Sequence, residues 1–413
     1  MIHSSHDRRI LRDLARRVAD IAAQPVMAER KQLWTAHNSL RSTTPLILVF
    51  PEGSWGELIT ADELQCEDDD ARRVEHQLRQ RVYTHEHFHD HSVIDDVWVV
   101  NAAVHSTGWG LWEHHHDSPA ARGAWGFDPV LKNRADLAKL HIPELTYDEA
   151  ATRQALAEWH DLWGDILTVE FKGVTRLTYH LMRQYIGLRG LTEMMMDMYD
   201  NPAFLHDVMQ LFVAGHKSML QQYIDFNLLA LNNDNSYQNS GGNGWTDELP
   251  AGGFNPERVR TVDMWADAEA QELAQVSPEQ HYEFSLRYEQ ELLEPFGLTG
   301  YGCCEDLTHK LDYVCQLPRI RRISISPFAD VDACAVKLKG NYIFSWKPQP
   351  SHLVGEFNAE FIRAYIRHTL DVCRANGCVV EMVLKDTHTC EHHPERFDEW
   401  TRIARELCEE FSS

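Results

Sequence analysis

The sequence predicts an α/β fold, a (β/α)8 TIM barrel that follows an N-terminal helical extension. Short β-prone runs alternate with longer helical segments, which is the pattern of a parallel sheet. The apolar runs end in polar or turn-forming residues, and a parallel barrel carries its reactive groups at those strand ends. A length of 413 residues suits one barrel with added helices. We therefore expect a helical extension over residues 1–44 and a barrel over residues 45–413.

Eight segments have the length and composition of strands, and helix signals lie between them. The predicted strands span residues 45–50, 97–100, 166–170, 228–232, 298–303, 322–326, 342–346 and 379–384. Pro202 opens an apolar stripe at helical spacing, and Ser277, Pro278 and Gln280 form a capping pattern. In the extension, Ile10 to Ile21 carry apolar residues at helical spacing, which predicts an amphipathic helix.

Composition and charge exclude several classes of function. The chain has 39 basic and 63 acidic residues, a formal charge of −24, which repels nucleic acid and anionic membranes. No run approaches the ~20 apolar residues of a membrane span, and the N-terminus lacks an apolar signal core. Nine cysteines, an odd number, favour reduced thiols over a disulfide framework. We expect a cytoplasmic protein.

The most specific local feature is the segment Tyr-Gly-Cys-Cys-Glu-Asp at 301–306, which follows an apolar strand. Thiolates and carboxylates are zinc ligands, so Cys303, Cys304 and Glu305 are candidate metal residues. Adjacent residues on a strand point to opposite faces, which predicts that only one of the two thiols faces the pocket. The alternative is a pair of small buried residues in a reduced protein.

Glu381 lies in an otherwise apolar strand, where an unpaired carboxylate is costly to bury. A metal, a cation or a substrate proton could be its partner, which makes Glu381 a candidate ligand or general acid/base. A structural salt bridge is the alternative. Asp386 and His388 follow the same strand, where contact with substrate is expected.

Three further patterns are weaker. Histidines cluster at 85–91 and 114–116, and we interpret both clusters as solvated. The glycine-rich segment 240–244, followed by Trp245, predicts either an active-site lid or a plain surface loop. The chain has no phosphate-binding glycine loop, no dinucleotide fingerprint, no nucleophile elbow and no His-Glu-x-x-His pair.

Four segments carry a resemblance to a known family: residues 45–55, 301–305, 323–327 and 347–350. In these the sequence resembles a bacterial branch of the uroporphyrinogen decarboxylase-like superfamily, and the resemblance runs from about Pro45 to Trp400. It implies a (β/α)8 barrel and a decarboxylase, a zinc methyltransferase or a corrinoid-dependent demethylase. Fold transfers more safely than reaction.

The resemblance does not extend to the true decarboxylases. Their arginine-rich Met-Arg-Gln-Ala-Gly-Arg signature is missing, and residues 51–55 read Pro-Glu-Gly-Ser-Trp. An acidic, aromatic strand end is unsuited to a substrate with many carboxylates. Haem biosynthesis is therefore not expected.

Zinc methyltransferases of this superfamily carry a His-x-Cys pair and a remote ligand. Cys304 matches the cysteine of the pair, but Gly302 stands where the histidine belongs. The resemblance implies that Cys303 or Glu305 substitutes for it, with Glu381 or Cys378 as the remote ligand. It further implies a zinc cofactor, a corrinoid (cobalamin) or corrinoid protein as methyl acceptor or donor, and a small methylated substrate.

The remaining candidates are assigned by their place at strand ends or by their aromatic character. Catalytic roles are predicted for Glu52, Asp234, Lys347 and Asp386. Substrate contacts are predicted for Trp55, Asn232, Trp245, Trp265, Trp346 and His388. Two alternatives stay open: a metal-free lyase that decarboxylates a small acid, and a non-catalytic barrel that binds a ligand or a corrinoid. A homodimer is possible in each case.

Overall fold

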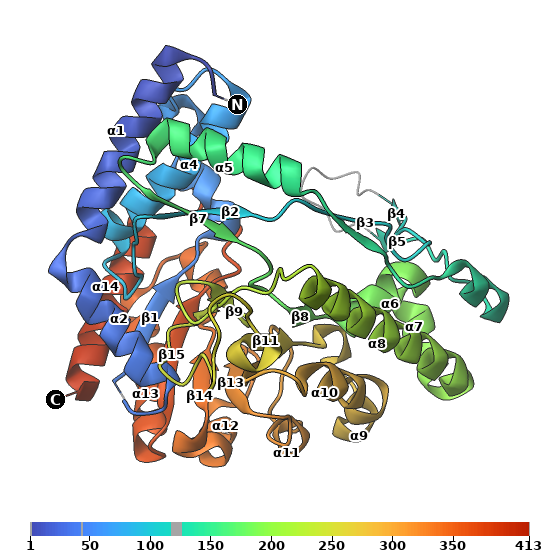
Figure 1. The fold of residues 1–413 in the computed structure, drawn as a ribbon. Helices are drawn as coiled ribbons and strands as arrows, with labels where there is room; N and C mark the ends of the chain where they lie inside the picture. The colour runs from blue at the N-terminus through green and yellow to red at the C-terminus, as the bar shows by residue number, and fades with distance from the viewer. Residues whose placement is uncertain (1, 43, 117–125, 413) are drawn as a thin grey trace.

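A sheet of seven parallel strands forms the centre of the molecule in the computed structural model, which describes residues 2–42, 44–116 and 126–412 (Figure 1). The order across the sheet is β1 (Leu46–Val49), β15 (Val379–Leu384), β14 (Ile343–Trp346), β13 (Ile320–Ile325), β12 (Leu298–Tyr301), β11 (Trp265–Ala268) and β8 (Thr178–Tyr179). All neighbours are parallel, so their carboxyl ends share one edge. The predicted α/β class is confirmed.

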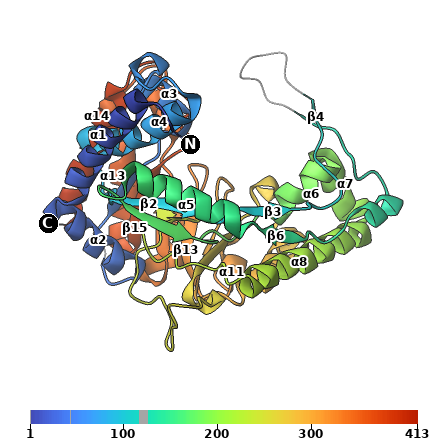
Figure 2. The ribbon, with the colours of Figure 1, turned by 45° about the horizontal axis from the view of Figure 1, so that its top comes forward.

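Helices surround this sheet and extend beyond it. They are α1 (Ser5–Ala22), α2 (Pro25–Asn38), α3 (Trp55–Leu58), α4 (Asp69–Tyr83), α5 (Glu149–Trp163), α6 (Leu181–Arg189), α7 (Leu191–Asp200), α8 (Pro202–Asp225), α9 (Pro278–His281), α10 (Arg287–Leu293), α11 (Leu311–Val314), α12 (Val331–Leu338), α13 (Ala359–Ala375) and α14 (Glu395–Ser412). The predicted N-terminal helix is α1, α8 begins at Pro202, and Ser277 caps α9 by accepting from Gln280 N. Figures 1 and 2 place α1, α2 and α14 at one end of the molecule and α6, α7 and α8 at the other.

Two of the predicted strands pair outside the main sheet. β2 (Val97–Asn101) and β7 (Thr168–Lys172) form a parallel two-stranded ladder of their own, with α5 beside it (Figure 1). Small antiparallel pairs complete the secondary structure: β3 (Val104–Ser106) with β6 (Leu145–Tyr147), β4 (His115–His116) with β5 (Gly126–Phe127), and β9 (Tyr237–Gln238) with β10 (Gly242–Asn243). The main sheet instead ends in β11 and β8, two strands that the sequence did not predict.

The two edge strands of the main sheet, β1 and β8, are not joined by a ladder within the described ranges. Residues 228–232 run near the β8 edge, where Leu229 bridges Val174. Asn232 is buried and links this segment to β11, because its side chain donates to Trp265 O and accepts from Trp265 N. The β9–β10 hairpin comes after this segment in the chain. Between the edge strands β8 and β1 the chain thus forms a hairpin rather than a regular strand of the sheet.

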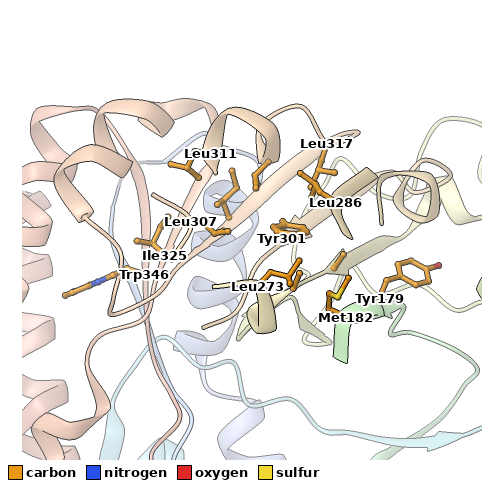
Figure 3. Packing of buried hydrophobic residues seen from close by; sticks show 14 of the residues in the cluster. Tyr179, Met182, Leu273, Leu286, Tyr301, Leu307, Leu311, Leu317, Ile325 and Trp346 are labelled. Atoms are coloured by element: carbon orange, nitrogen blue, oxygen red, sulfur yellow. The ribbon is translucent and has the colours of Figure 1, made fainter. Parts of the chain in front are cut away.

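Alternation along the strands separates two environments. Ile323 and other outward residues belong to the large apolar core under the helices. Figure 3 shows Ile325 and Trp346 of this core with Tyr301 and Leu307. The residues between them are polar and point to the concave side. Among these, Arg322, Ser324, Ser345 and Glu381 are fully buried. The polar interior is what positions the candidate site.

None of the helices that the structure describes is long and apolar enough to cross a membrane.

Candidate functional site

The two adjacent cysteines lie just beyond the carboxyl end of β12. Gly302 has φ of 91°, a left-handed conformation that ends the strand, and a Cβ there would lie 2.7 Å from Leu307 Cδ1. Because the chain turns at Gly302, strand alternation no longer applies, and Cys303 Sγ lies 3.6 Å from Cys304 Sγ. The expectation that strand alternation points the two thiols to opposite faces was wrong, because the turn brings the sulfurs together.

Glu305 supports this turn from behind. Its buried carboxylate accepts hydrogen bonds from Cys303 N at 2.7 Å and Ala270 N at 3.2 Å. Lys310 holds the same loop by donating to Leu273 O at 2.6 Å. The two carboxylate oxygens are thus engaged by backbone, so Glu305 positions Cys303 rather than joining the sulfurs as a neighbouring donor.

Lys385 and Asp386, which follow β15, reach the thiols from the opposite part of the edge. Lys385 Nζ lies 3.9 Å from Cys303 Sγ and 3.0 Å from Asp386 Oδ1. Cys304 Sγ lies 3.7 Å from Asp386 Oδ2. Although burial disfavours the charged amine, Cys303 and Asp386 raise the pKa of Lys385. A cation, two thiols and a carboxylate therefore form one cluster.

Glu52 and Glu57 fix the loop that carries Asp386. Glu52, at φ 49°, accepts a hydrogen bond from Asp386 N at 2.9 Å, and burial raises the pKa of its carboxyl. Glu57 accepts from Thr389 Oγ1 at 2.6 Å and from Cys390 N at 2.9 Å. Burial opposes ionisation of Glu57, but these hydrogen bonds lower its pKa to about 2. Both carboxylates hold backbone in place.

Two groups that sequence reasoning missed complete the edge. Glu269 follows β11, and burial together with Cys303 raises the pKa of its carboxyl to about 10, so it is neutral at pH 7. His180 Nδ1 lies 3.4 Å from Glu269 Oε1, and burial lowers the pKa of His180 to about 4. The sequence could have indicated Glu269 as a candidate, because it directly follows the strand at residues 265–268. That strand was not predicted, since it contains Asp267.

The thiol of Cys303 is held in its protonated form. Its hydrogen bond with Cys304 and its burial both raise its pKa. Ser240 Oγ donates to its sulfur at 3.3 Å. Without a bound cation stronger than Lys385, Cys303 is therefore a thiol rather than a thiolate.

Lys347 is a buried amine on the concave side of β14. Its Nζ donates to Ser345 Oγ at 2.6 Å and to Ser345 O at 3.0 Å. Burial lowers the pKa of Lys347 to about 7, against the opposing effect of Glu381. An amine that is partly neutral at physiological pH can accept or donate a proton.

Glu381 lies deeper in the sheet and is occupied by other partners. Its Oε1 accepts from Arg322 Nε at 2.9 Å and from Ser345 Oγ at 2.5 Å, and its Oε2 lies 3.4 Å from His37 Nε2. Burial opposes ionisation, yet Arg322 and His37 hold the pKa of Glu381 well below its usual range. The structure does not bring Glu381 to the cysteines. Glu381 instead forms the structural salt bridge that was the alternative reading of the sequence.

The predicted aromatic residues are dispersed. Trp265 stacks against Arg322, whose guanidinium lies 5.3 Å from the ring, and Trp346 packs outward against Tyr365. Trp245 packs beside Lys31 of α2. Trp55 alone lines a cavity next to the site, between α4 and β1.

Other predicted residues also lie away from the thiols. Asp234 pairs with Lys172 of β7 and accepts from Ser236 N. Asn232 joins strands, as described above. The side chain of His388 is exposed beside Gly53, and Cys378 is buried beneath α12, where its thiol donates to Ala335 O at 3.6 Å.

The glycine-rich segment and the histidine clusters have structural places. Residues 240–244 are buried rather than forming a lid or a surface loop: a Cβ at Gly242 would lie 2.3 Å from Arg322 Cζ. His114 and His116 are exposed near Asp128. Residues 85–91 include a turn of π-helix over Thr84–Phe88.

The donors at the strand ends fit zinc in type and in pairwise spacing. Two sulfurs at ~2.3 Å from a tetrahedral zinc lie about 3.8 Å apart, and a sulfur and a carboxylate oxygen about 3.5 Å apart. The corresponding separations here are 3.6 Å and 3.7 Å. Among the described residues, no group of three or more His, Cys, Asp or Glu side chains is arranged so that it could hold a metal ion. Lys385 is the cation that lies among the donors in this structure.

Comparison with known proteins gives a distant likeness. No protein-family model matches the sequence, and no curated protein matches it. A solved structure of a methyltransferase from Methanosarcina mazei aligns over 93% of this chain and 99% of its own, with 10% identity and a TM-score of 0.49. A similarity of this size carries no argument about function, so the proposal below rests on the residues.

Proposed function

We propose that this chain is a zinc-dependent methyltransferase that moves a methyl group between a small methylated substrate and a corrinoid. The carrying observation is the strand-end group of Cys303, Cys304 and Asp386, whose separations of 3.6 Å and 3.7 Å suit neighbouring ligands of one zinc ion. The match of Cys304 to the cysteine of the His-x-Cys pair of the zinc methyltransferases supports the same reaction, with Gly302 standing where the histidine belongs. On this proposal the open sheet is a barrel whose last position is filled by residues 228–232.

Bound zinc would supply Lewis-acid activation of a thiolate or of the heteroatom that carries the methyl group. The chain's own residues prepare the place. Glu305 fixes the backbone of Cys303, and Glu52 fixes that of Asp386. Lys385 offsets the negative charge of ionised donors, and the neutral Glu269 carboxyl holds a proton next to Cys303.

Metal content tests this proposal. We expect about one zinc per chain in untagged protein, measured by elemental mass spectrometry, because two thiolates and a carboxylate make a high-affinity set. Cys304→Ala should lose the zinc and Asp386→Asn should bind it more weakly. Cys315→Ala is the matched control, since this partly buried thiol lies away from the strand ends.

Either of two results would overturn the zinc site. One is a parent protein without metal under zinc-replete conditions. The other is a zinc content that Cys304→Ala leaves unchanged.

One observation favours a second candidate, a metal-free lyase acting on a small organic acid. Lys347 is buried and its pKa is lowered to about 7, which suits an amine that transfers a proton during decarboxylation. A metal-free parent protein that releases carbon dioxide from a small acid, with turnover lost in Lys347→Met, would favour this reaction over methyl transfer.

A further inference from the structure

A cavity of about 400 Å³ opens between α4 and the carboxyl end of β1. One wall is apolar and aromatic, formed by Leu48, Phe50, Trp55, Val93 and Tyr237. Its volume falls within the range of small-molecule sites, and its lining combines apolar surface with a few polar groups, as such sites do. Residues 90–91 close the edge of β1 that faces away from β15, since His91 N donates to Ile47 O at 3.0 Å. The cavity therefore lies at the carboxyl end of β1, the end of the sheet that carries the candidate site.

The cavity adjoins the thiol cluster through Tyr237. Its ring packs against Phe50 with centroids 5.6 Å apart. Burial raises the pKa of the Tyr237 phenol to about 12, and the nearby charge of Lys385 opposes this effect. A molecule in the cavity would therefore have one end near the reactive edge.

The opposite wall is polar and comes from one face of α4. Gln77, Gln80, Arg81 and Thr84 follow helical spacing and all line the cavity. The apolar positions of α4, such as Leu78 and Val82, face α1 instead and belong to a separate core. On this polar face Gln77 is exposed and Gln80 and Arg81 are partly buried, so their amides and guanidinium are accessible to a ligand in the cavity.

Arg81 is the only ionised side chain among the described residues that line this cavity. Its hydrogen bonds within the described ranges use Nη1, which donates to Val97 O at 3.0 Å and to Asp95 O at 3.4 Å. The carboxylate of Asp95 lies 3.9 Å away and does not line the cavity. Nε and Nη2 thus remain as a pair of donors, the geometry that a single carboxylate matches.

We propose that this cavity binds a small monocarboxylate with an apolar body, anchored by Arg81. The chain has 63 acidic residues, but none of them lines this cavity. Its amides, aromatic rings and single arginine therefore favour a small anion with an apolar body. That this ligand is the substrate rests on the proposed function. Its binding to the cavity is independent of that function.

Benzoate is a suitable probe, and benzamide is its uncharged counterpart. Isothermal titration of the full-length chain should show benzoate binding that Arg81→Gln weakens about tenfold or more, because a charged hydrogen-bonded pair is lost. Arg81→Lys should lie between the two, and benzamide should bind the parent protein more weakly than benzoate does. Arg73→Gln is the matched control, since Arg73 lies on the same helix, is exposed and pairs with Asp70.

A second variant keeps the test decisive if the proteins with Arg81 substitutions misfold. Gln80→Trp fills the cavity and leaves Arg81 intact, so it should abolish benzoate binding while the thermal unfolding profile stays cooperative. The proposal is overturned if the parent does not bind benzoate, or if Arg81→Gln and Gln80→Trp bind it as the parent does.

The outcome is separate from that of the metal test. Benzoate binding should persist in Cys304→Ala, which keeps the cavity. A chain that binds benzoate through Arg81 but holds no zinc would refute the zinc methyltransferase and leave this site standing.

Discussion

Glu381→Ala should lower the free energy of unfolding by about 3–5 kcal/mol, because it leaves the buried Arg322 guanidinium without its counter-charge. Both side chains of the pair are fully buried. Arg322 also donates to Asn38 Oδ1 at 2.7 Å, which ties α2 to the sheet. Urea denaturation of the two proteins measures the difference.

A neighbouring ion pair supplies the control. Glu248 and Arg321 form a two-bond contact of 2.6 Å and 2.8 Å, but Glu248 is 41% exposed. Glu248→Ala should therefore cost no more than ~1 kcal/mol. Equal losses in the two variants would contradict the role given to Glu381.

The effect depends on pH with a definite sign. The pKa of Glu381 is depressed in the folded chain, so its stabilising contribution is complete above its ordinary value of 4.5 and is lost as the pH falls towards the folded pKa. The difference between the parent protein and Glu381→Ala should shrink below that value. Replacing both partners, as Arg322→Met with Glu381→Leu, should recover much of the loss.

Cys304→Ala should lower the rate of methyl transfer by about 100-fold or more, since a loss of several kcal/mol of metal-assisted activation corresponds to at least that factor. The assay follows conversion of methylcob(III)alamin to cob(I)alamin by absorbance, with small thiols as methyl acceptors. Cys315→Ala should retain the parent rate. A Cys304→Ala protein as active as the parent would show that this thiol takes no part.

The strands of the carboxyl-terminal half were predictable because they are apolar runs bounded by turn residues. Predicted strands 298–303, 322–326, 342–346 and 379–384 correspond to β12, β13, β14 and β15. By contrast, β8 has only two residues and β11 contains Asp267, so neither segment is distinguished from a loop by its sequence. Segments 97–100 and 166–170 are strands, but their pairing with each other depends on contacts between distant residues.

Some residues of the candidate site could likewise be predicted from the sequence, and others could not. The sequence located Cys303, Cys304 and Asp386 because they follow recognisable strands. It could not show that the turn at Gly302 joins the two sulfurs, since a backbone angle decides this. The burial of Glu381 signalled a partner, but Arg322 is 59 residues away in the chain and only the fold identifies it.

The central claim is that Cys303 and Cys304 are neighbouring ligands of one zinc ion, and X-ray absorption at the zinc edge tests it most directly. The claim predicts two sulfur neighbours at ~2.3 Å with oxygen or nitrogen at ~2.0–2.1 Å. In Cys303→Ala the sulfur count should fall to about one. A zinc environment of oxygen and nitrogen alone, or a sulfur count that Cys303→Ala leaves unchanged, would contradict it.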